Sequence, residues 1–332
     1  MAKTVVFHEY GGPEVLRLAD LPVGEPGPGE VRIGVQAIGL NRAEALFRAG
    51  VYIEQARSFP GRLGAECSGV IEAVGLGVTG FAPGDAISTV PQFSYNDYAV
   101  YAEQAIVPAS AVVHRPHGLD AVGAAAVWMP YLTAYSSLVE TAGVRPGDTV
   151  ALNAASSSAG LALIDVANHL GLRPIALTRT AEKRDALLKH GAAEVIVTDE
   201  EDPPARLLRA TGGRGVELVL DAVAGPGVTD LARAVAPGGM LLVYGGLSGQ
   251  PTPYPGLTLG LPALNMRSFT VLETLRDPER LRRGVAFVAA GVRSGAFRPV
   301  VDCTFALADA ADAHRYLESN AQVGKVVLTV AE

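Results

Sequence analysis

The sequence predicts an α/β protein of two domains, one rich in short strands and one built on a doubly wound parallel sheet. Residues 1–120 contain short apolar runs separated by glycine- and proline-rich turns, which is typical of a β-rich domain. From residue 148, apolar runs alternate with helical segments, as in successive β-α-β units. A chain of 332 residues also exceeds one ordinary hydrophobic core, so two domains are expected.

The β-rich part is expected to form strands in the runs KTVVFHEY, GEVRIGVQAIGL, GAECSGVIEAVG, GDAISTV and DYAVYAEQAIVPA. The breaks EPGPGE and FAPGD have the residue types of turns. The amino-acid composition then changes at residue 121. The alanine- and leucine-rich stretch 121–144 predicts a helix that ends at Gly143.

The second part predicts a strand, helix, strand order that continues to residue 246. Strands are expected at 148–155, 174–180, 193–199, 216–224 and 240–246, and helices at 156–171, 181–191, 205–213 and 227–239. Residues 251–266 are rich in Pro, Gly and Leu, and predict a loop and short helix over an active-site cleft. A helix at 278–294 and a mixed strand and helix tail follow.

Composition and charge exclude several classes of partner. No apolar run reaches the roughly 18 residues that a membrane span requires, and the first residues lack the apolar core of a secretory signal, so a cytoplasmic protein is expected. The formal net charge is −7, and only four of the 27 basic residues are lysines. Without a basic run, nucleic acid is not an expected partner. Cys67 and Cys303 are too far apart in sequence to suggest a disulfide framework or a Cys-rich metal site.

The segment NAASSSAG, residues 153–160, lies between a predicted strand and a predicted helix. A dinucleotide loop needs small residues there, because the backbone approaches the pyrophosphate and helix N–H groups point at it. Ser157 and Ser158 stand where glycines are expected, and Gly160 remains. Serines also cap ordinary helices. The position after the first strand of the β-α-β array favours the dinucleotide loop.

The end of the second strand of this array predicts the choice of cofactor. NAD-specific sites place Asp or Glu there to bind the ribose 2′-hydroxyl. This chain has Thr178, Arg179 and Thr180, with Lys183 one turn into the helix. Cationic side chains attract a 2′-phosphate, so these residues predict NADPH. The alternative is that Arg179 and Lys183 are ordinary solvated surface residues.

With these segments placed, the whole chain resembles the medium-chain dehydrogenase/reductase superfamily, and most closely its zinc-independent quinone oxidoreductase branch. The resemblance rests on motifs in the family's order, HEYGGPEVLRL, AIGLNRAEALFRAGVY, GAECSGVIEAVGLGVTGFAPGDAI, LTAYSSL, VRPGDTVALNAASSSAGLALIDVANHLG, TRTAEKRDALLKHGA and GGRGVELVLDAVAG. It implies a GroES-like catalytic domain at 1–122, completed by 298–332, and a Rossmann NADPH-binding domain at 123–297. It also implies a cofactor in the cleft between the domains, and a homodimer.

Zinc enzymes of this superfamily carry Cys, His and usually a second Cys as catalytic ligands. The matching positions here are Asn41, Ala65 and Met129, none of which is a credible zinc ligand. The four-cysteine structural zinc lobe is also missing, so no metal is expected. Glu66 stands at the family's glutamate position beside the lost zinc site and is expected to be a buried, hydrogen-bonded carboxylate. Thr198 replaces a tyrosine that the branch often has at the end of the third strand.

The resemblance implies a set of cofactor contacts. It places Asn41 and Lys325 near the nicotinamide, and Gly245 and Gly246 past a later strand, where glycines also serve as plain turns. The residues that match cofactor-binding positions are Asn41, Thr133, Ser157, Ser158, Ala159, Thr178, Arg179, Lys183, Val223, Gly245, Gly246 and Lys325.

Tyr52 and Asn41 are the candidate catalytic residues. In related enoyl-thioester reductases, the tyrosine that matches Tyr52 of the AGVY segment is thought to donate a proton or hydrogen bond. A phenol with a pKa of about 10 stays protonated at neutral pH and can stabilise an enolate. The alternative is a packing tyrosine at the mouth of the cleft. Further candidates for lining an apolar site are Phe93, Trp128, Tyr131 and Leu257.

Together these features predict a zinc-independent, NADPH-dependent reductase that passes hydride to a small apolar or conjugated carbonyl substrate such as a quinone or an enone. One alternative is a trans-acting enoyl-thioester reductase of fatty acid or polyketide synthesis. Another, from a different class, is an NADPH-binding sensor or structural protein without turnover.

Overall fold

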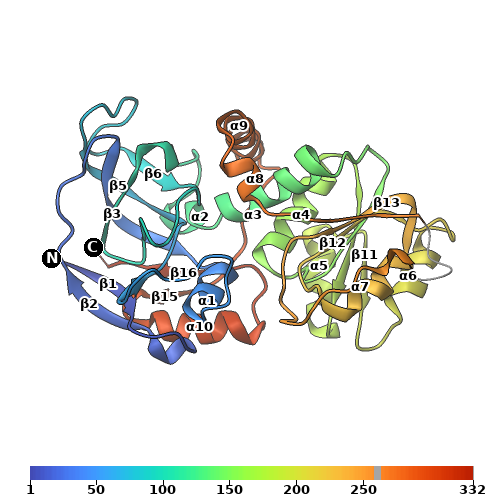
Figure 1. The fold of residues 1–332 in the computed structure, drawn as a ribbon. Coiled ribbons are helices and arrows are strands. Elements are labelled where there is room, and N and C mark those ends of the chain that lie inside the picture. The colour runs from blue at the N-terminus through green and yellow to red at the C-terminus, as the bar shows by residue number, and fades with distance from the viewer. Residues whose placement is uncertain (258–262, 332) are drawn as a thin grey trace. The chain divides into compact units, whose positions relative to one another are not determined.

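The structure, a computed structural model, describes residues 1–257 and 263–331. It divides the chain into two compact units (Figure 1), unit 1 with Met1–Met129 and Pro299–Glu332, and unit 2 with Pro130–Arg298. Compactness alone defines these units, so the domain boundaries expected at 122/123 and 297/298 stay a prediction.

Unit 1 is built on two sheets. The smaller has the order β2 (Arg17–Leu21), β1 (Ala2–Phe7), β4 (Gly61–Arg62). The larger has the order β15 (Val301–Ala306), β16 (Lys325–Thr329), β3 (Glu30–Gly39), β5 (Cys67–Val74), β6 (Ala86–Thr89), β8 (Val112–His114), and β7 (Gln104–Pro108) also pairs with β3. In Figure 1 the red β16 runs through the same unit as the blue β3, with which it pairs antiparallel. Strands from both ends of the sequence thus form one sheet.

The core of unit 1 follows from alternating side chains. Val31, Ile33 and Val35 of β3 are buried, and the residues between them are half-buried. Each such side chain contributes about 1.5–3 kcal/mol on full burial. The helical elements around this core are η1 (Pro13–Val15), α1 (Arg42–Arg48), η2 (Ala109–Ala111), α2 (Ala121–Ala124), η7 (Leu307–Asp309) and α10 (Ala310–Ser319).

Unit 2 contains the predicted doubly wound parallel sheet, which is thereby confirmed. The strand order is β11 (Glu194–Val197), β10 (Arg173–Thr178), β9 (Thr149–Leu152), β12 (Val216–Asp221), β13 (Val235–Val243), β14 (Asn265–Ser268), and every neighbouring pair is parallel. The chain moves outward from β9 in one direction and returns beside it at β12. Ligands of such sheets bind at this reversal, outside the carboxyl ends of the strands.

The helical elements of unit 2 connect these strands. They include α4 (Ser158–His169), η4 (Ala181–Lys183), α5 (Arg184–His190), α6 (Pro203–Ala210), η5 (Gly225–Gly227), α7 (Val228–Ala232), η6 (Pro255–Leu257), α8 (Leu272–Leu275) and α9 (Pro278–Ser294). The last of these confirms the helix predicted at 278–294.

Three sequence predictions for this part of the chain were wrong in extent. The single helix at 121–144 is instead α2, a turn, α3 (Trp128–Tyr135) and η3 (Ser136–Thr141). Pro130 explains the break, because proline is tolerated only in the first turn of a helix. The helix at 227–239 stops at Ala232, since Val235 already pairs with Val216 of β12.

The third correction concerns residues 251–266. The short helix expected there is present as η6, but residues 265 and 266 belong to the strand β14, whose Met266 pairs with Leu241 of β13. Residues 258–262 of that predicted loop lie outside the described residues. In the described part of the chain, no helix is both long and apolar enough to cross a bilayer.

Candidate functional site

The cofactor residues predicted in unit 2 gather at one edge of its sheet. Ser157, Ser158 and Ala159 follow β9, Thr178 and Arg179 lie at the end of β10, Lys183 ends η4, Val223 follows β12, and Gly245 and Gly246 follow β13. These four strands are parallel neighbours, so their carboxyl ends and the loops after them meet at the same edge. Thr133 lies in α3 and is buried.

The loop after β9 turns tightly into α4. The Ser157 hydroxyl accepts a hydrogen bond from the Gly160 N–H at 3.0 Å and caps the helix. A Cβ on Gly160 would lie 2.4 Å from the carbonyl oxygen of Ala155, so only glycine fits. The turn also holds Ala154 of this loop in the left-handed region, with φ of +49°. The remaining N–H groups of the first turn belong to small residues, the arrangement that binds phosphate at a helix N-terminus.

Two cationic side chains lie in this region, Lys183 beside the loop and Arg179 just after β10. The Lys183 Nζ donates to the Ser156 hydroxyl at 3.0 Å, which joins η4 to the loop. Arg179 is exposed directly after β10, and Thr178 before it is buried. The carboxylate that would select NADH is therefore replaced by positive charge.

The loop after β12 is held by two residues that sequence analysis did not select. Asn153 donates from Nδ2 to Asp221 Oδ1 at 2.5 Å and accepts at Oδ1 from the Ala222 N–H at 2.7 Å. Asp221 Oδ1 also accepts from the N–H groups of Val223 and Ala224, at 2.8 and 2.9 Å. A polar residue closing the apolar run VELVL was the signal that could have found Asp221.

The two predicted glycines after β13 differ. A Cβ on Gly245 would lie 2.4 Å from the Ala222 carbonyl oxygen, so the loops after β12 and β13 approach closely there. A Cβ on Gly246 would meet no atom within 4 Å. Of these two positions, the first requires glycine for steric reasons and the second does not.

Unit 1 brings Asn41 and Lys325 together around a buried carboxylate. The Lys325 Nζ donates to Glu66 Oε2 at 2.6 Å and to Asn41 Oδ1 at 2.7 Å. Glu66 is 0% exposed and Lys325 is 1% exposed. The Asn41 Nδ2 lies 3.3 Å from the same Glu66 oxygen. The orientation of the Asn41 amide is therefore fixed, and Glu66 is the buried, hydrogen-bonded carboxylate that was expected.

A second buried carboxylate, Glu44, extends this cluster and was missed by sequence analysis. Its Oε2 accepts from the backbone N–H of Asn41 at 2.7 Å. Burial raises the pKa of Glu44 to about 7, although the nearby Lys325 charge lowers it. Tyr95 hydrogen-bonds to Glu44, and its own pKa is raised well above the ordinary value by burial and then by the Glu44 charge. The spacing N-x-x-E at 41–44, typical of a helix start, was the available signal.

Glycine and backbone groups complete the surroundings of Lys325 and Glu66. A Cβ on Gly39 would lie 2.0 Å from the Ala125 carbonyl oxygen and 2.7 Å from Lys325 Cε. The Met129 N–H donates to Glu66 Oε1 at 2.8 Å. Among residues 1–257 and 263–331, no group of three His, Cys, Asp or Glu side chains is placed to hold a metal ion. Independence from zinc stays a prediction.

Tyr52 lies in the loop after α1, and its ring is half-buried. Its ring centroid is 6.0 Å from that of Tyr95, the partner of Glu44. Glu54 holds the loop by accepting from the Asn96 amide at 2.6 Å. The residues on either side of Tyr52, Val51 and Ile53, are 69% and 75% exposed. The loop therefore combines a phenol with exposed apolar side chains.

The other candidate lining residues differ in their surroundings. Tyr131 is packed inside unit 2, with its ring stacked on Phe297 at 5.1 Å and its hydroxyl donating to Asp165 at 2.6 Å. Trp128 is also buried. Phe93 packs at the edge of the core of unit 1, and Leu257 ends η6.

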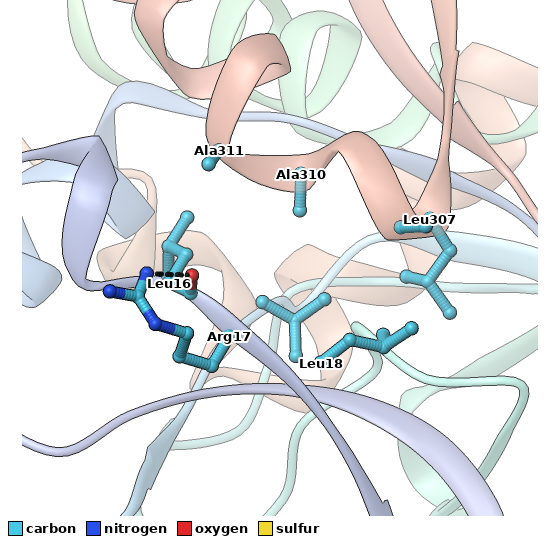
Figure 2. A pocket seen from close by; sticks show the side chains of 8 residues that line it. Leu16, Arg17, Leu18, Leu307, Ala310 and Ala311 are labelled. Atoms are coloured by element: carbon cyan, nitrogen blue, oxygen red, sulfur yellow. Dashed lines mark hydrogen bonds between the residues drawn. The ribbon is translucent and has the colours of Figure 1, made fainter.

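Two pockets in unit 1 lie away from these residues. Figure 2 shows the first, where Leu16 and Leu18 face Leu307, Ala310 and Ala311. Its volume of about 20 Å³ is room for about one water molecule. The second, beside Tyr98 and Gln104, has about 180 Å³. Both are smaller than the roughly 300–1,000 Å³ of ordinary ligand pockets.

Comparisons with known proteins agree with this geometry. A family model described as alcohol dehydrogenase GroES-like domain matches residues 27–117, and one described as zinc-binding dehydrogenase matches 190–328. A quinone oxidoreductase of Pseudomonas aeruginosa is 36% identical over 334 residues, with 99% of each chain covered. A 2-haloacrylate reductase of a Burkholderia species is 30% identical, again with 99% of each covered.

A solved structure has the same fold over nearly the whole chain. It is the quinone oxidoreductase of Escherichia coli complexed with NADPH, which is 28% identical, covers 98% of this chain and 99% of its own, and has a TM-score of 0.89. The GroES-like and Rossmann-type architecture predicted from the sequence is thereby confirmed. This chain belongs to the medium-chain dehydrogenase/reductase superfamily, in its quinone oxidoreductase-like branch.

Proposed function

We propose that this protein uses NADPH to reduce a quinone, an enone or a similar conjugated carbonyl compound, without a metal ion. It is an NADPH-dependent oxidoreductase, because its relatives include quinone oxidoreductases and a 2-haloacrylate reductase, and one of the similar structures holds NADPH.

One observation carries the proposal from the chain's own residues. Positive charge stands at the carboxyl edge of the unit 2 sheet, where Lys183 is hydrogen-bonded to Ser156 of the loop after β9 and Arg179 is exposed. The tight approach at Gly160 lets the loop backbone lie close to a pyrophosphate. These residues fit a dinucleotide with a 2′-phosphate, which when bound supplies a hydride.

The residues of unit 1 suit the other half of the reaction. Negative charge grows on the conjugated oxygen as the β-carbon accepts hydride, so a hydrogen-bond donor is needed there. The Tyr52 hydroxyl is the proposed donor. Val51 and Ile53 beside it offer exposed apolar surface to a flat or aliphatic substrate. Asn41, whose amide is fixed by Lys325, is the proposed contact with the nicotinamide.

The experiment is a panel of substrates with NADPH and NADH compared for each. A simple quinone, an enone, a 2-haloacrylate and an enoyl thioester are each incubated with the protein, and cofactor oxidation and the reduced product are both measured. Oxidation of NADPH with reduction of the quinone or the enone supports the proposal. Turnover of the enoyl thioester alone would assign the protein to thioester reduction instead. NADPH binding without turnover of any member would contradict an enzymatic role.

We also propose a homodimer formed through an edge of the unit 2 sheet. β14 is the last strand of that sheet and pairs with β13 on one side. An edge strand of this kind can pair with its copy in a second chain. Light scattering after size-exclusion chromatography measures the mass directly, and a monomer at working concentration would contradict the proposal.

A further inference from the structure

Asn153 and Asp221 occupy the point of the unit 2 sheet where the strand order reverses. We propose that they form a positioning pair, which holds the loops after β9 and β12 in the conformation that binds NADPH. This inference rests on the proposed function, since it concerns the affinity for that cofactor. Neither residue has to touch the cofactor for this role.

The first step is the link between the two loops. Asn153 is the residue after β9, and Asp221 is the last residue of β12, its neighbour in the sheet. Both ends of the Asn153 amide are used, Nδ2 toward Asp221 Oδ1 at 2.5 Å and Oδ1 toward the Ala222 N–H at 2.7 Å. An amide offers a donor and an acceptor at once, which a carboxylate or a hydrocarbon does not. Asn153 therefore joins the start of the dinucleotide loop to the loop after β12.

The second step is the backbone that Asp221 controls. The same Oδ1 accepts from the N–H groups of Val223 and Ala224. Ala224 has φ of +59° and ψ of −156°, a conformation that costs a non-glycine residue about 1–3 kcal/mol and persists only when its surroundings impose it. Asp221 holds it together with the Ser248 N–H, which donates to the Val223 carbonyl at 2.9 Å, and Asp221 thereby helps to set the position of Val223, a proposed cofactor contact.

The third step asks whether Asp221 serves cofactor binding or folding stability. Asp221 is 1% exposed, and no cationic side chain pairs with it among residues 1–257 and 263–331. Its Oδ2 has no hydrogen-bond partner in the same part of the chain. A buried carboxylate in this state is costly, so stability alone would favour an apolar residue. Two preformed loops, in contrast, lower the ordering cost of binding.

The test measures the Kd for NADPH by fluorescence titration, without substrate, in single variants. Asn153→Ala is expected to raise Kd about tenfold, which corresponds to about 1.4 kcal/mol. Asn153→Asp, which sets a carboxylate against Asp221, is expected to raise it further. Asp221→Asn keeps an oxygen that can accept from Asn153 and from the N–H groups of Val223 and Ala224, so its Kd is expected to stay closer to wild type than that of Asn153→Ala.

Asn168→Ala is the matched control. The Asn168 amide donates to the Gly191 carbonyl at 3.0 Å in the same unit, away from both loops, so this variant loses one amide hydrogen bond of an exposed side chain. Its Kd is expected to stay within about twofold of wild type, or about 0.4 kcal/mol. The Asn153→Ala and Asn168→Ala comparison decides the question even if the aspartate variant does not fold, because both keep the native charges. Turnover of Asn168→Ala at saturating NADPH should match that of wild type.

The outcomes distinguish this inference from the proposed function. If wild type binds NADPH and Asn153→Ala binds it as tightly, the positioning pair is overturned and the proposed function stands. If Asn153→Ala and Asn168→Ala weaken binding equally, the effect is general destabilisation and the pair is again overturned. A wild-type protein that binds no NADPH would overturn both.

Discussion

Asn41 in unit 1 and Asn153 in unit 2 each direct an amide at a buried carboxylate, yet the two clusters neutralise that charge differently. Around Asn41, the Lys325 ammonium lies 2.6 Å from Glu66. Around Asn153, the carboxylate of Asp221 is met by N–H groups alone. One cluster depends on a buried opposite charge, and the other on the shape of the backbone.

The difference indicates where each cluster is vulnerable. Removing one member of a buried ion pair leaves an uncompensated charge, which typically costs about 3–5 kcal/mol of folding stability. A carboxylate held by backbone N–H groups loses its partners only if the loops themselves move. We therefore expect substitutions around Asn41 to affect folding first, and substitutions around the dinucleotide loop to affect binding first.

The largest effect is expected when the buried charge pair is broken. Lys325→Met keeps the length of the side chain but leaves Glu66 without a cation, so the free energy of unfolding should fall by about 3–5 kcal/mol. Urea titration measures it. The control is Lys3→Met, whose partner Asp20 forms an exposed pair at 3.1 Å with side-chain exposures of 48% and 59%. Exposed pairs contribute about 0–1 kcal/mol. Equal losses in the two variants would remove the contrast on which the comparison rests.

Tyr52→Phe separates chemistry from packing inside unit 1. The ring next to Tyr95 stays and only the hydroxyl is deleted, so turnover on the true substrate should fall by about 10²–10³ with folding nearly unchanged. Tyr98→Phe is the control, because its hydroxyl donates to Glu30 at 2.7 Å, a contact to which we give no chemical role. Turnover of Tyr52→Phe close to that of Tyr98→Phe would leave Tyr52 as a packing residue and the proton would come from water.

Glu44 makes the stability of unit 1 depend on pH. Its folded pKa of about 7 lies above the ordinary value of 4.5, so the folded protein holds this proton more tightly than the unfolded chain. The contribution of this proton to the free energy of unfolding is complete below about pH 4.5 and is lost as pH rises through about 7. At about 1.4 kcal/mol per pKa unit, the loss is of the order of 3 kcal/mol.

Glu44→Gln removes this titration. The groups that face Glu44 are Lys325, Tyr95 and Tyr101, and they remain in the variant. His314, whose pKa burial lowers to about 3, changes stability in the opposite direction and is common to both proteins. The quantity to measure is therefore the wild-type minus variant difference in unfolding free energy, which should decrease from pH 4.5 to pH 7. A difference that is constant with pH would refute the assignment.

The smallest effect is expected at the carboxyl end of β10 in unit 2. Arg179→Ala removes an exposed guanidinium, and a lost arginine–phosphate contact of about 1.5–3 kcal/mol corresponds to a roughly 10- to 150-fold weaker binding of NADPH. Binding of NADH should hardly change. Arg214→Ala, an exposed arginine just before the amino end of β12, is the control. A wild type that uses both cofactors equally well would contradict the interpretation of this strand end.

The sequence predicted the fold well because its signals are local. Alternating strands and helices and the small residues of NAASSSAG identify a dinucleotide-binding sheet without tertiary information. The contact between Asn41 and Lys325 joins residues 284 positions apart, and only the family resemblance suggested that both belong to one site.

Glu44 and Asp221 show what the sequence could not reveal. Each is an acidic residue next to an apolar segment, and acidic residues in such places are usually solvent-exposed. Their burial depends on donors supplied by other segments, such as Tyr95 for Glu44 and Asn153 for Asp221. The helix at 227–239 was predicted too long for a similar reason, since the pairing of Val235 with β12 overruled the local pattern. The break in the helix predicted at 121–144 has a local cause, Pro130, which was visible in the sequence.

The position of β16 in the sequence has a consequence for how the protein is made. Unit 2 is one continuous segment, but unit 1 closes only when β15 and β16 join β3. Domains usually fold in order as the ribosome releases them. Here residues 1–129 are synthesised first but cannot complete their sheet until β15 and β16 follow. Glu66 also lacks its cation until Lys325 is synthesised. A released chain that ends just before β15 should protect unit 2 from protease while leaving residues 1–129 sensitive, so the unit synthesised second would be the first to fold.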